Sequence, residues 1–374
     1  MSEWIEKPLG EVTSYLAKGI PPKYTEDFTE NAIYVLNQKC NREFVISYDA
    51  AKLHDLTQKK VAEEKMLQPG DVLINSTGEG TAGRVAQIWD LPYPTTTDGH
   101  MILMRPTFEI DPLYYGYAVK AYQSQIETLA EGSTGQTEIN KKRLLDEIII
   151  RFPKDKDEQH SIAEVLENID NKIEVNNKIN RNLAEQQKNI VLNFLQAKEM
   201  PIKLLSEIST IKYGKGLPKN ELKIDGYPVF GGNGIIGYFN KFMYEEPQIL
   251  ISCRGAASGN ILESLPYSFV TSNSLVVELD NYIYFEFLKQ YLNMNQLHGY
   301  ATGSAQPQIT IDNIKGVEVP YPDIDQIIEL SKGLQSLSKY KLLVVKENKN
   351  LTQIRDSILP KLMSGELDVS EFDI

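Results

Sequence analysis

In two long stretches of the chain, the residues of one largely apolar stripe recur at alternating intervals of four and three positions. The first begins at Ile162 and the second at Leu330, and polar residues such as Asn180 and Asn348 interrupt both stripes near the middle. A mean spacing of 3.5 residues places the stripe on one side of an α-helix, facing one partner helix, as in a coiled coil. The apolar seam positions are Ile162, Leu166, Ile169, Ile173, Leu183 and Ile190, and then Leu330, Leu334, Leu337, Val344, Leu351 and Ile358.

The two predicted helices begin in similar surroundings. Each follows a proline, Pro153 or Pro322, and each has an aspartate near the position that caps a first turn. The second helix can bury its stripe against the first only by running antiparallel to it, because a whole domain separates the two in the chain. The alternative is that each helix buries its stripe within its own domain. The stripe is narrow, long and interrupted by polar residues, which favours the helix pair.

The chain also repeats itself. KPLGEVTSYLAKG (7–19) corresponds to KLLSEISTIKYGKG (203–216), DVLINSTGEGTAGRV (71–85) to QILISCRGAASGNI (248–261), and TTDGHMILM (96–104) to VTSNSLVVE (270–278). In the same order, DPLYYGYAVKAY (111–122) corresponds to NYIYFEFLKQYL (281–292), and GSTGQTEINKKRLLDEIIIRFP (132–153) to GSAQPQITIDNIKGVEVPYP (303–322). Two copies are too few for a solenoid, so the pattern predicts a duplicated domain.

Short apolar runs between glycine, proline and asparagine residues predict strands in both copies. They are Val72–Asn75, Met101–Met104, Ile148–Phe152, Ile249–Ser252 and Leu275–Glu278, whereas the aromatic-rich segments Tyr114–Ile126 and Tyr284–Leu292 predict helices with buried rings. The predicted fold class is therefore α+β: two similar α+β domains separated by an antiparallel two-helix coiled coil, with pseudo-two-fold symmetry. The predicted boundaries are 1–153 and 201–322 for the domains, and 154–200 and 323–374 for the helices with the C-terminal tail.

Composition excludes several classes of protein. No run approaches the ~18 apolar residues that a membrane helix needs, and the segment MSEWIEKPLG lacks the apolar core of a signal peptide. The two cysteines fit a reducing cytoplasm, and neither they nor the four scattered histidines show metal-ligand spacing. The net charge of −12 is unusual for a chain that contacts phosphates, so we expect its cations to gather on one face or a partner to supply positive charge.

No catalytic motif is present. GEGTAG (78–83) has the spacing G-x-G-x-x-G, but RVAQIWDLPYPTTT follows it where a dinucleotide site needs a helix, and the corresponding segment 255–259 lacks the pattern. A phosphate-binding G-x-x-x-x-G-K-[ST] loop and a G-x-S-x-G nucleophile elbow are also missing. We therefore expect a non-catalytic protein that needs neither cofactor nor metal.

Polar loops recur at the same two places in each copy. Arg and Lys recognise guanine edges, Asn and Gln recognise adenine, and all of them also hold phosphates. Any single residue here is more simply a polar turn residue, but the two loops as a set, occurring twice, favour DNA binding. The candidate residues are Lys18, Lys23, Ser76, Thr77, Arg84, Thr134, Gln136, Asn140, Lys141, Lys142 and Arg143 in the first copy, and Lys215, Lys219, Arg254, Ser258, Asn260, Ser304, Gln306, Gln308 and Thr310 in the second.

Over nearly its whole length the chain resembles the specificity subunits of type I restriction-modification systems. The resemblance rests on Trp4 to Val12 with its second version KLLSEI, GYPVFGGNGIIGYF (226–239), the GSTGQ loop with its INKK continuation, the helix start Pro153–Gln159, and ILPKLMSGEL (358–367). It implies two target-recognition domains that read the halves of a bipartite asymmetric DNA site. It also implies that the helices dock methyltransferase subunits, and that nuclease-translocase subunits join for cleavage. The second helix start departs from the pattern, with Asp325 in place of Glu.

Two alternatives remain open at this point. One is a specificity subunit of a methyltransferase that has no type I nuclease. The other is an adaptor that spaces two protein-binding domains and touches no nucleic acid. The DNA sequence recognised and the base modified do not follow from the sequence.

Overall fold

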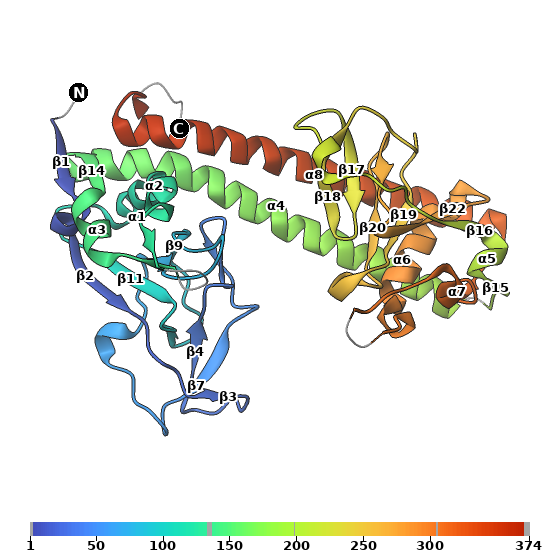
Figure 1. The fold of residues 1–374 in the computed structure, drawn as a ribbon, viewed down its shortest axis with the longest axis horizontal. Helices are drawn as coiled ribbons and strands as arrows, with labels where there is room; N and C mark the ends of the chain where they lie inside the picture. Colours follow the sequence, from blue (N-terminus) through green and yellow to red (C-terminus); the bar gives the residue numbers. More distant parts are fainter. Residues whose placement is uncertain (1–2, 133–136, 198, 304–305, 370–374) are drawn as a thin grey trace. The chain divides into compact units, whose positions relative to one another are not determined.

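The computed structural model describes residues 3–132, 137–197, 199–303 and 306–369, drawn in Figure 1. The chain divides into two compact units. Unit 1 comprises Met1–Glu174 and Asn348–Ile374, and unit 2 comprises Val175–Glu347. Each unit therefore contains one copy of the repeat together with segments of both long helices.

Unit 1 is built on two four-stranded sheets. One has the order β2-β11-β8-β9 and the other β10-β4-β7-β3, and strand β1 pairs with β14 beside them. The strands are β1 (Trp4–Pro8), β2 (Thr13–Lys18), β3 (Tyr24–Thr25), β4 (Ala32–Leu36), β5 (Asn41–Arg42), β6 (Val45–Ile46), β7 (Lys52–Asp55), β8 (Asp71–Asn75), β9 (Val85–Ile88), β10 (Thr95–Thr97), β11 (Met101–Pro106), β12 (Ala130–Glu131), β13 (Glu138–Ile139) and β14 (Ile149–Pro153). The shorter helices are α1 (Pro112–Ala121), α2 (Gln123–Glu127) and α3 (Lys141–Glu147).

Unit 2 repeats this plan, with the same strand order in its central sheet and one strand fewer in its second sheet. Its central sheet has the order β16-β22-β19-β20, its second sheet β18-β17-β21, and β15 pairs with β23. The elements are β15 (Ile202–Leu204), α5 (Leu205–Ile208), β16 (Ser209–Tyr213), β17 (Tyr227–Gly231), β18 (Gly234–Phe239), β19 (Ile249–Ser252), β20 (Ile261–Glu263), β21 (Phe269–Val270), β22 (Ser274–Leu279), α6 (Phe285–Asn295), α7 (Ile311–Ile314) and β23 (Glu318–Pro320). The duplication predicted from the five sequence blocks is thus a duplication of topology.

A glycine marks one close approach that both units share. A Cβ on Gly19 would lie 2.2 Å from the carbonyl oxygen of Thr97, and a Cβ on Gly214 would lie 2.2 Å from that of Thr271. Only glycine lets the chain directly after β2 and after β16 come so near the other sheet. The two glycines are equivalent in the structure, since the N–H of Gly19 donates to the carbonyl of Met101 and the N–H of Gly214 to that of Ser274.

The two aromatic-rich segments contribute buried residues to the cores, as predicted. Tyr114 and Tyr115 of α1 are fully buried, and so is Leu288 of α6 apart from 1% of its surface. The segment predicted as one helix from Tyr114 to Ile126 is broken at Tyr122 into α1 and α2. The buried rings therefore serve packing rather than ligand binding.

The long helices α4 (Lys156–Ala197) and α8 (Ile324–Ser364) run antiparallel within each unit. In unit 1, Asp170 contacts Arg355 and Ile173 contacts Asn348, so residue numbers rise along one helix as they fall along the other. In unit 2, Gln187 donates to the carbonyl of Leu334 over 3.2 Å. The predicted fold class, two similar α+β domains with an antiparallel helix pair, is confirmed. Helix α8 continues through Pro360 for another four residues.

The predicted seam is wrong at one end of α4. Ile190 is 38% exposed, and its neighbour Val191 is fully buried against Phe287 and Ile327. In α8, Ser331 is fully buried beside the partly buried Leu330, whereas the predicted Leu334 is fully buried on the stripe. A straight helix turns 3.6 residues per turn rather than 3.5, so a strict heptad drifts off the contact line over three or four repeats.

Both predicted ways of burying the stripe occur, between the two long helices and within the core of a unit. Ile162 and Leu166 of α4 pack into the core of unit 1, as the alternative of burial within the helix's own domain required. Leu359 and Leu362 of α8 join that same core, while Val191 of α4 joins a core cluster of unit 2. Each unit thus incorporates segments of both long helices into its core. Within the described residues, no helix has both the length and the apolar character needed to cross a membrane.

Candidate nucleic-acid interface

In unit 1 the fold brings the two predicted polar loops together. The loop after β8 and the segment before α3 meet at an isolated bridge between Thr77 and Glu138. The backbone N–H of Ile139 donates to the carbonyl of Ser76 over 2.8 Å, and Lys18 forms an ion pair with Glu138. The first basic residue of the set therefore lies beside both loops.

Unit 2 repeats this meeting at the equivalent place. Arg254, after β19, bridges to Gln308, and the N–H of Gly255 donates to the carbonyl of Pro307 over 2.9 Å. The hydroxyl of Ser258 donates to that same carbonyl over 2.9 Å. The two loops that recur in the sequence are thus neighbours in both copies.

An open hollow of about 780 Å³ lies over these loops in unit 2. It is lined by Arg254, Asn260 and Gln306 from the predicted set, and also by Asn233 and Asn273. The last two lie in GGNG (231–234) and TSNS (271–274), and neither belongs to the predicted set. Arg254 and Asn273 are exposed, so their donors and acceptors are available to a ligand. We call these five residues face 2.

The corresponding surface of unit 1 carries different side chains. In the aligned blocks His100 corresponds to Ser274, the residue after Asn273. The Nδ1 of His100 lies 2.9 Å from the hydroxyl of Thr77. Gln38, at the turn after β4, faces the same loop, where the hydroxyl of Thr81 donates to its Oε1 over 3.3 Å. His100 is exposed. We call Thr77, His100 and Gln38 face 1.

Four candidate residues are either buried or cap a helix. Ser76 and Ser258 are buried, with 0% and 3% of their surfaces exposed. Asn140 caps α3 by accepting from the N–H groups of Lys142 and Arg143, and Thr310 occupies the equivalent cap of α7. Polar side chains of these types are the usual caps of helix N-termini.

The remaining basic candidates differ in how their charge is used. Arg143 pairs with Glu131 over 2.7 Å and with Glu147 over 2.6 Å, and hydrogen bonds to Glu147 and Glu131 raise its pKa. Lys23, Lys141, Lys142, Lys215 and Lys219 are exposed. Arg84 donates to the carbonyl of Gly80 over 3.0 Å and lines a separate cleft against α8. Thr134, Gln136 and Ser304 lie outside the described residues.

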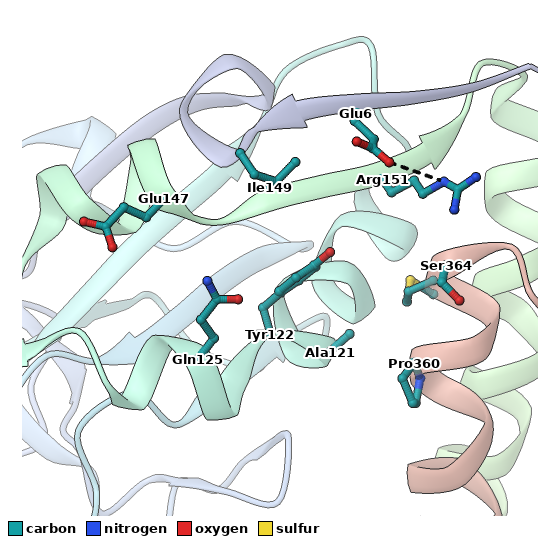
Figure 2. Close-up of a pocket in the computed structure, with 10 residues that line it drawn as sticks. Glu6, Ala121, Tyr122, Gln125, Glu147, Ile149, Arg151, Pro360 and Ser364 are labelled. Carbon is teal, nitrogen blue, oxygen red and sulfur yellow. Dashed lines mark ion pairs between the residues drawn. The ribbon is translucent and has the colours of Figure 1, made fainter.

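A second hollow of unit 1, about 470 Å³, contains none of the candidates (Figure 2). Figure 2 shows Glu6 of β1 and Arg151 of β14 paired across its rim, with their charged atoms 3.8 Å apart. Tyr122 and the end of α8 at Pro360 and Ser364 form the other walls. Arg151 also lies over the Trp4 ring, 5.3 Å from its centroid, so this contact joins β14 to β1.

Metal-ligand clusters, thiols and the GEGTAG segment are the places where catalytic chemistry could arise in this chain. In the part of the chain that the structure describes, no group of three His, Cys, Asp or Glu side chains is arranged to hold a metal ion. Both cysteines are buried, and burial raises the pKa of the Cys40 and Cys253 thiols. GEGTAG leads into strand β9 (Val85–Ile88), so the helix that a dinucleotide site requires is replaced by a strand.

Several known proteins similar to this chain are described as type I specificity subunits. A family profile described as the type I restriction modification DNA specificity domain matches residues 1–185 and 198–353. A Mycoplasma genitalium protein assigned as a type I specificity subunit is 30% identical over 280 residues, covering 68% of this chain and 71% of that protein. The type I restriction enzyme specificity subunit MjaIX of Methanocaldococcus jannaschii is 22% identical, covering 99% of this chain and 94% of that protein. The crystal structure of a type I restriction-modification S subunit from M. genitalium aligns with a TM-score of 0.59 at 21% identity, covering 97% of this chain and 96% of that one.

Proposed function

The chain belongs to the type I restriction-modification DNA specificity family, and from that premise we propose that each of its two domains reads one half of a bipartite asymmetric DNA site. One observation carries the proposal. The same two loops meet at the same place in both copies, at Thr77–Glu138 and at Arg254–Gln308, yet they present different side chains. A scaffold that is duplicated while its exposed polar groups differ is suited to reading two unlike sequences at one spacing.

The side chains of the two faces fit groove chemistry. The guanidinium of Arg254 can make a bidentate contact to guanine, and the amides of Asn233 and Asn273 can do the same to adenine. Thr77 and His100 of face 1 offer a mixed set of donors and acceptors. Ser76 and Ser258 are left out of the proposed contacts because their side chains are buried.

We infer that other chains carry out modification and cleavage. We propose two methyltransferase subunits as partners, with nuclease-translocase subunits joining for cleavage, and action in the cytoplasm, where the chromosome lies. Exposed apolar side chains on α8 support helix docking: Tyr340, Leu343 and Val345 in unit 2 and Ile354 in unit 1 are each about half exposed. Exposed apolar residues on a helix are typical of a surface that a partner covers.

The test is selection of bound sequences from a random duplex library by the complex with its methyltransferase partner. Arg254→Ala with Asn273→Ala should relax one half-site and leave the other half-site and the spacer unchanged. Thr77→Ala with His100→Ala should relax the opposite half-site. Each lost base contact should cost about 1–3 kcal/mol of discrimination.

A matched control is Asn293→Ala, which removes an exposed amide from α6, outside face 2. It should leave the selected motif intact. Selection of the original motif by the face 2 variant, with a normal melting temperature, would contradict the assignment of reading to this face.

A further inference from the structure

Unit 1 contains a basic cleft that neither polar face includes. It has a volume of about 970 Å³ and lies where the β5–β6 hairpin, the end of the loop after β8, helices α1 and α2, and α8 meet. Its charged lining consists of five cations and two carboxylates, namely Arg42, Arg84, Lys120, Lys349 and Arg355 with Glu43 and Asp356. In a chain of net charge −12, such a gathering of positive charge requires an explanation.

Four of these cations have no carboxylate partner within the described residues. Arg84 donates to the carbonyl of Gly80, and Lys120 donates to the amide oxygen of Gln123 over 2.7 Å. No ion pair engages Arg42 or Lys349 in that part of the chain. Arg355 alone is paired, with Asp170 and with Asp356. The cleft therefore holds positive charge that the protein itself leaves uncompensated.

Lys120 shows the electrostatic consequence. Burial lowers the pKa of its ammonium, and the nearby Arg355 guanidinium lowers that pKa further. An anion in the cleft would reverse both effects, because it would replace lost hydration and offset the repulsion between the cations.

The equivalent region of unit 2 is built differently. There Lys289 of α6 forms ion pairs with Glu263 over 2.6 Å and with Glu286 over 2.7 Å. Its charge is thus neutralised by the protein. Lys120 of α1 thus keeps the charge that Lys289 of α6 shares with two glutamates, although the unit 2 pocket also contains Lys188, Lys339 and Lys341.

A strained hairpin holds one rim of the cleft. Glu43 and Phe44, the two residues between β5 and β6, both have positive φ, 52° and 69°, which bulky L-residues adopt rarely. Phe44 is held in this state because its ring packs against Tyr117 with the ring centroids 4.9 Å apart. The amide of Asn41 donates to the carbonyl of Arg84 over 2.9 Å and so ties Arg42's strand to the loop. Strain of this kind is commonly retained at functional sites.

We propose that this cleft binds backbone phosphates of the DNA whose half-site is read by face 1. The inference rests on the proposed function and extends it to a group that anchors DNA without reading its sequence. Arg84 ends the same loop that presents Thr77, so the cleft and face 1 are two sides of one loop. Guanidinium groups suit phosphate oxygens, with which they form two parallel hydrogen bonds.

The experiment measures duplex binding by the full chain in complex with its methyltransferase, by fluorescence anisotropy at several salt concentrations. Arg42→Ala with Arg84→Ala is the principal variant. Lys349→Ala is the second variant, since Lys349 is exposed on a helix surface and its loss should not disturb folding. Lys156→Ala is the matched control, an exposed lysine that donates to the carbonyl of Phe108 and does not line the cleft.

Loss of each phosphate contact should weaken binding about fivefold to tenfold at 0.1 M salt and reduce the slope of log affinity against log salt by about one, so the double arginine variant should reduce that slope by about two. Target and non-target duplexes should weaken by the same factor, and the selected motif should not change. The control should match the parent chain.

Three results would overturn the inference. Relaxation of one half-site would make these arginines base readers, unchanged DNA affinity with lost methyltransferase binding would make the cleft a site for an acidic protein surface, and no change in either would make it structural. Failure of the proposed function would be recognised separately, because the parent complex itself would then select no motif.

Discussion

Replacing Arg355 with methionine would remove the positive charge from the ion pair that joins α8 to α4 in unit 1. Arg355 is 8% exposed, and its guanidinium donates to the carboxylate of Asp170 over 2.7 Å. The other oxygen of Asp170 accepts a hydrogen bond from the hydroxyl of Tyr117 over 2.8 Å. The substitution keeps most of the side-chain volume but leaves the Asp170 carboxylate without a counter-charge.

The structure sets the size of the effect. Removing one partner of a buried ion pair typically costs 3–5 kcal/mol, so we expect about 2–3 kcal/mol here, since the Asp170 side chain is 20% exposed and keeps its bond from Tyr117. Adding Asp170→Asn should recover about 1–2 kcal/mol, because the uncompensated charge is gone and the amide oxygen still accepts from the tyrosine hydroxyl. Asp356→Asn, at a side chain that is 56% exposed, should change stability by less than about 0.5 kcal/mol.

Urea unfolding of the full chain, followed by circular dichroism, measures these differences. The transition that involves unit 1 should shift in Arg355→Met, return part of the way in the double variant, and remain in place in Asp356→Asn. If the effects of Arg355→Met and Asp170→Asn simply added, the two side chains would not interact, and the pairing of α4 with α8 at this level would be refuted.

Three further predictions concern other parts of the molecule. Arg105→Met should cost about 3–5 kcal/mol, because it leaves Asp71 buried with no ion-pair partner, and denaturant unfolding would expose a smaller role. Gly214→Ala should lower the melting temperature far more than Gly216→Ala, since a Cβ on Gly214 meets a backbone oxygen and one on Gly216 meets nothing within 4 Å; equal melting temperatures would disprove the close approach. The isolated chain should bind duplex weakly and the methyltransferase complex tightly, because the chain's net charge is −12; gel-shift titrations at fixed salt that give the same affinity would contradict this.

Periodicity and repetition were sufficient to predict the duplicated α+β domains and the antiparallel helices. They were insufficient for the detailed register. Ile190 was assigned to the seam because the heptad was extended rigidly, whereas the helix brings Val191 to the contact. The break at Tyr122 between α1 and α2 was missed as well, because the stripe of buried aromatic residues continues through it.

The candidate site was predictable as a pair of loops and much less so as individual residues. The recurrence of the blocks located both loops, and the fold brings them together. The side chains of Asn140 and Thr310, however, can contact bases in principle, and in the structure the same side chains cap helices. Asn233 and Asn273 were missed because their segments became neighbours of the loops only through pairing of strands distant in the chain.

Methylation-aware sequencing of the host genome, with and without this gene, tests the central claim most directly. The account predicts one methylated motif that depends on the gene, made of two unlike half-sites at a fixed spacing. Complementation with the face 2 variant, Arg254→Ala with Asn273→Ala, should keep methylation at that spacing while relaxing one half-site. An identical set of methylated motifs in the strains with and without the gene would contradict the conclusion that this chain directs DNA modification.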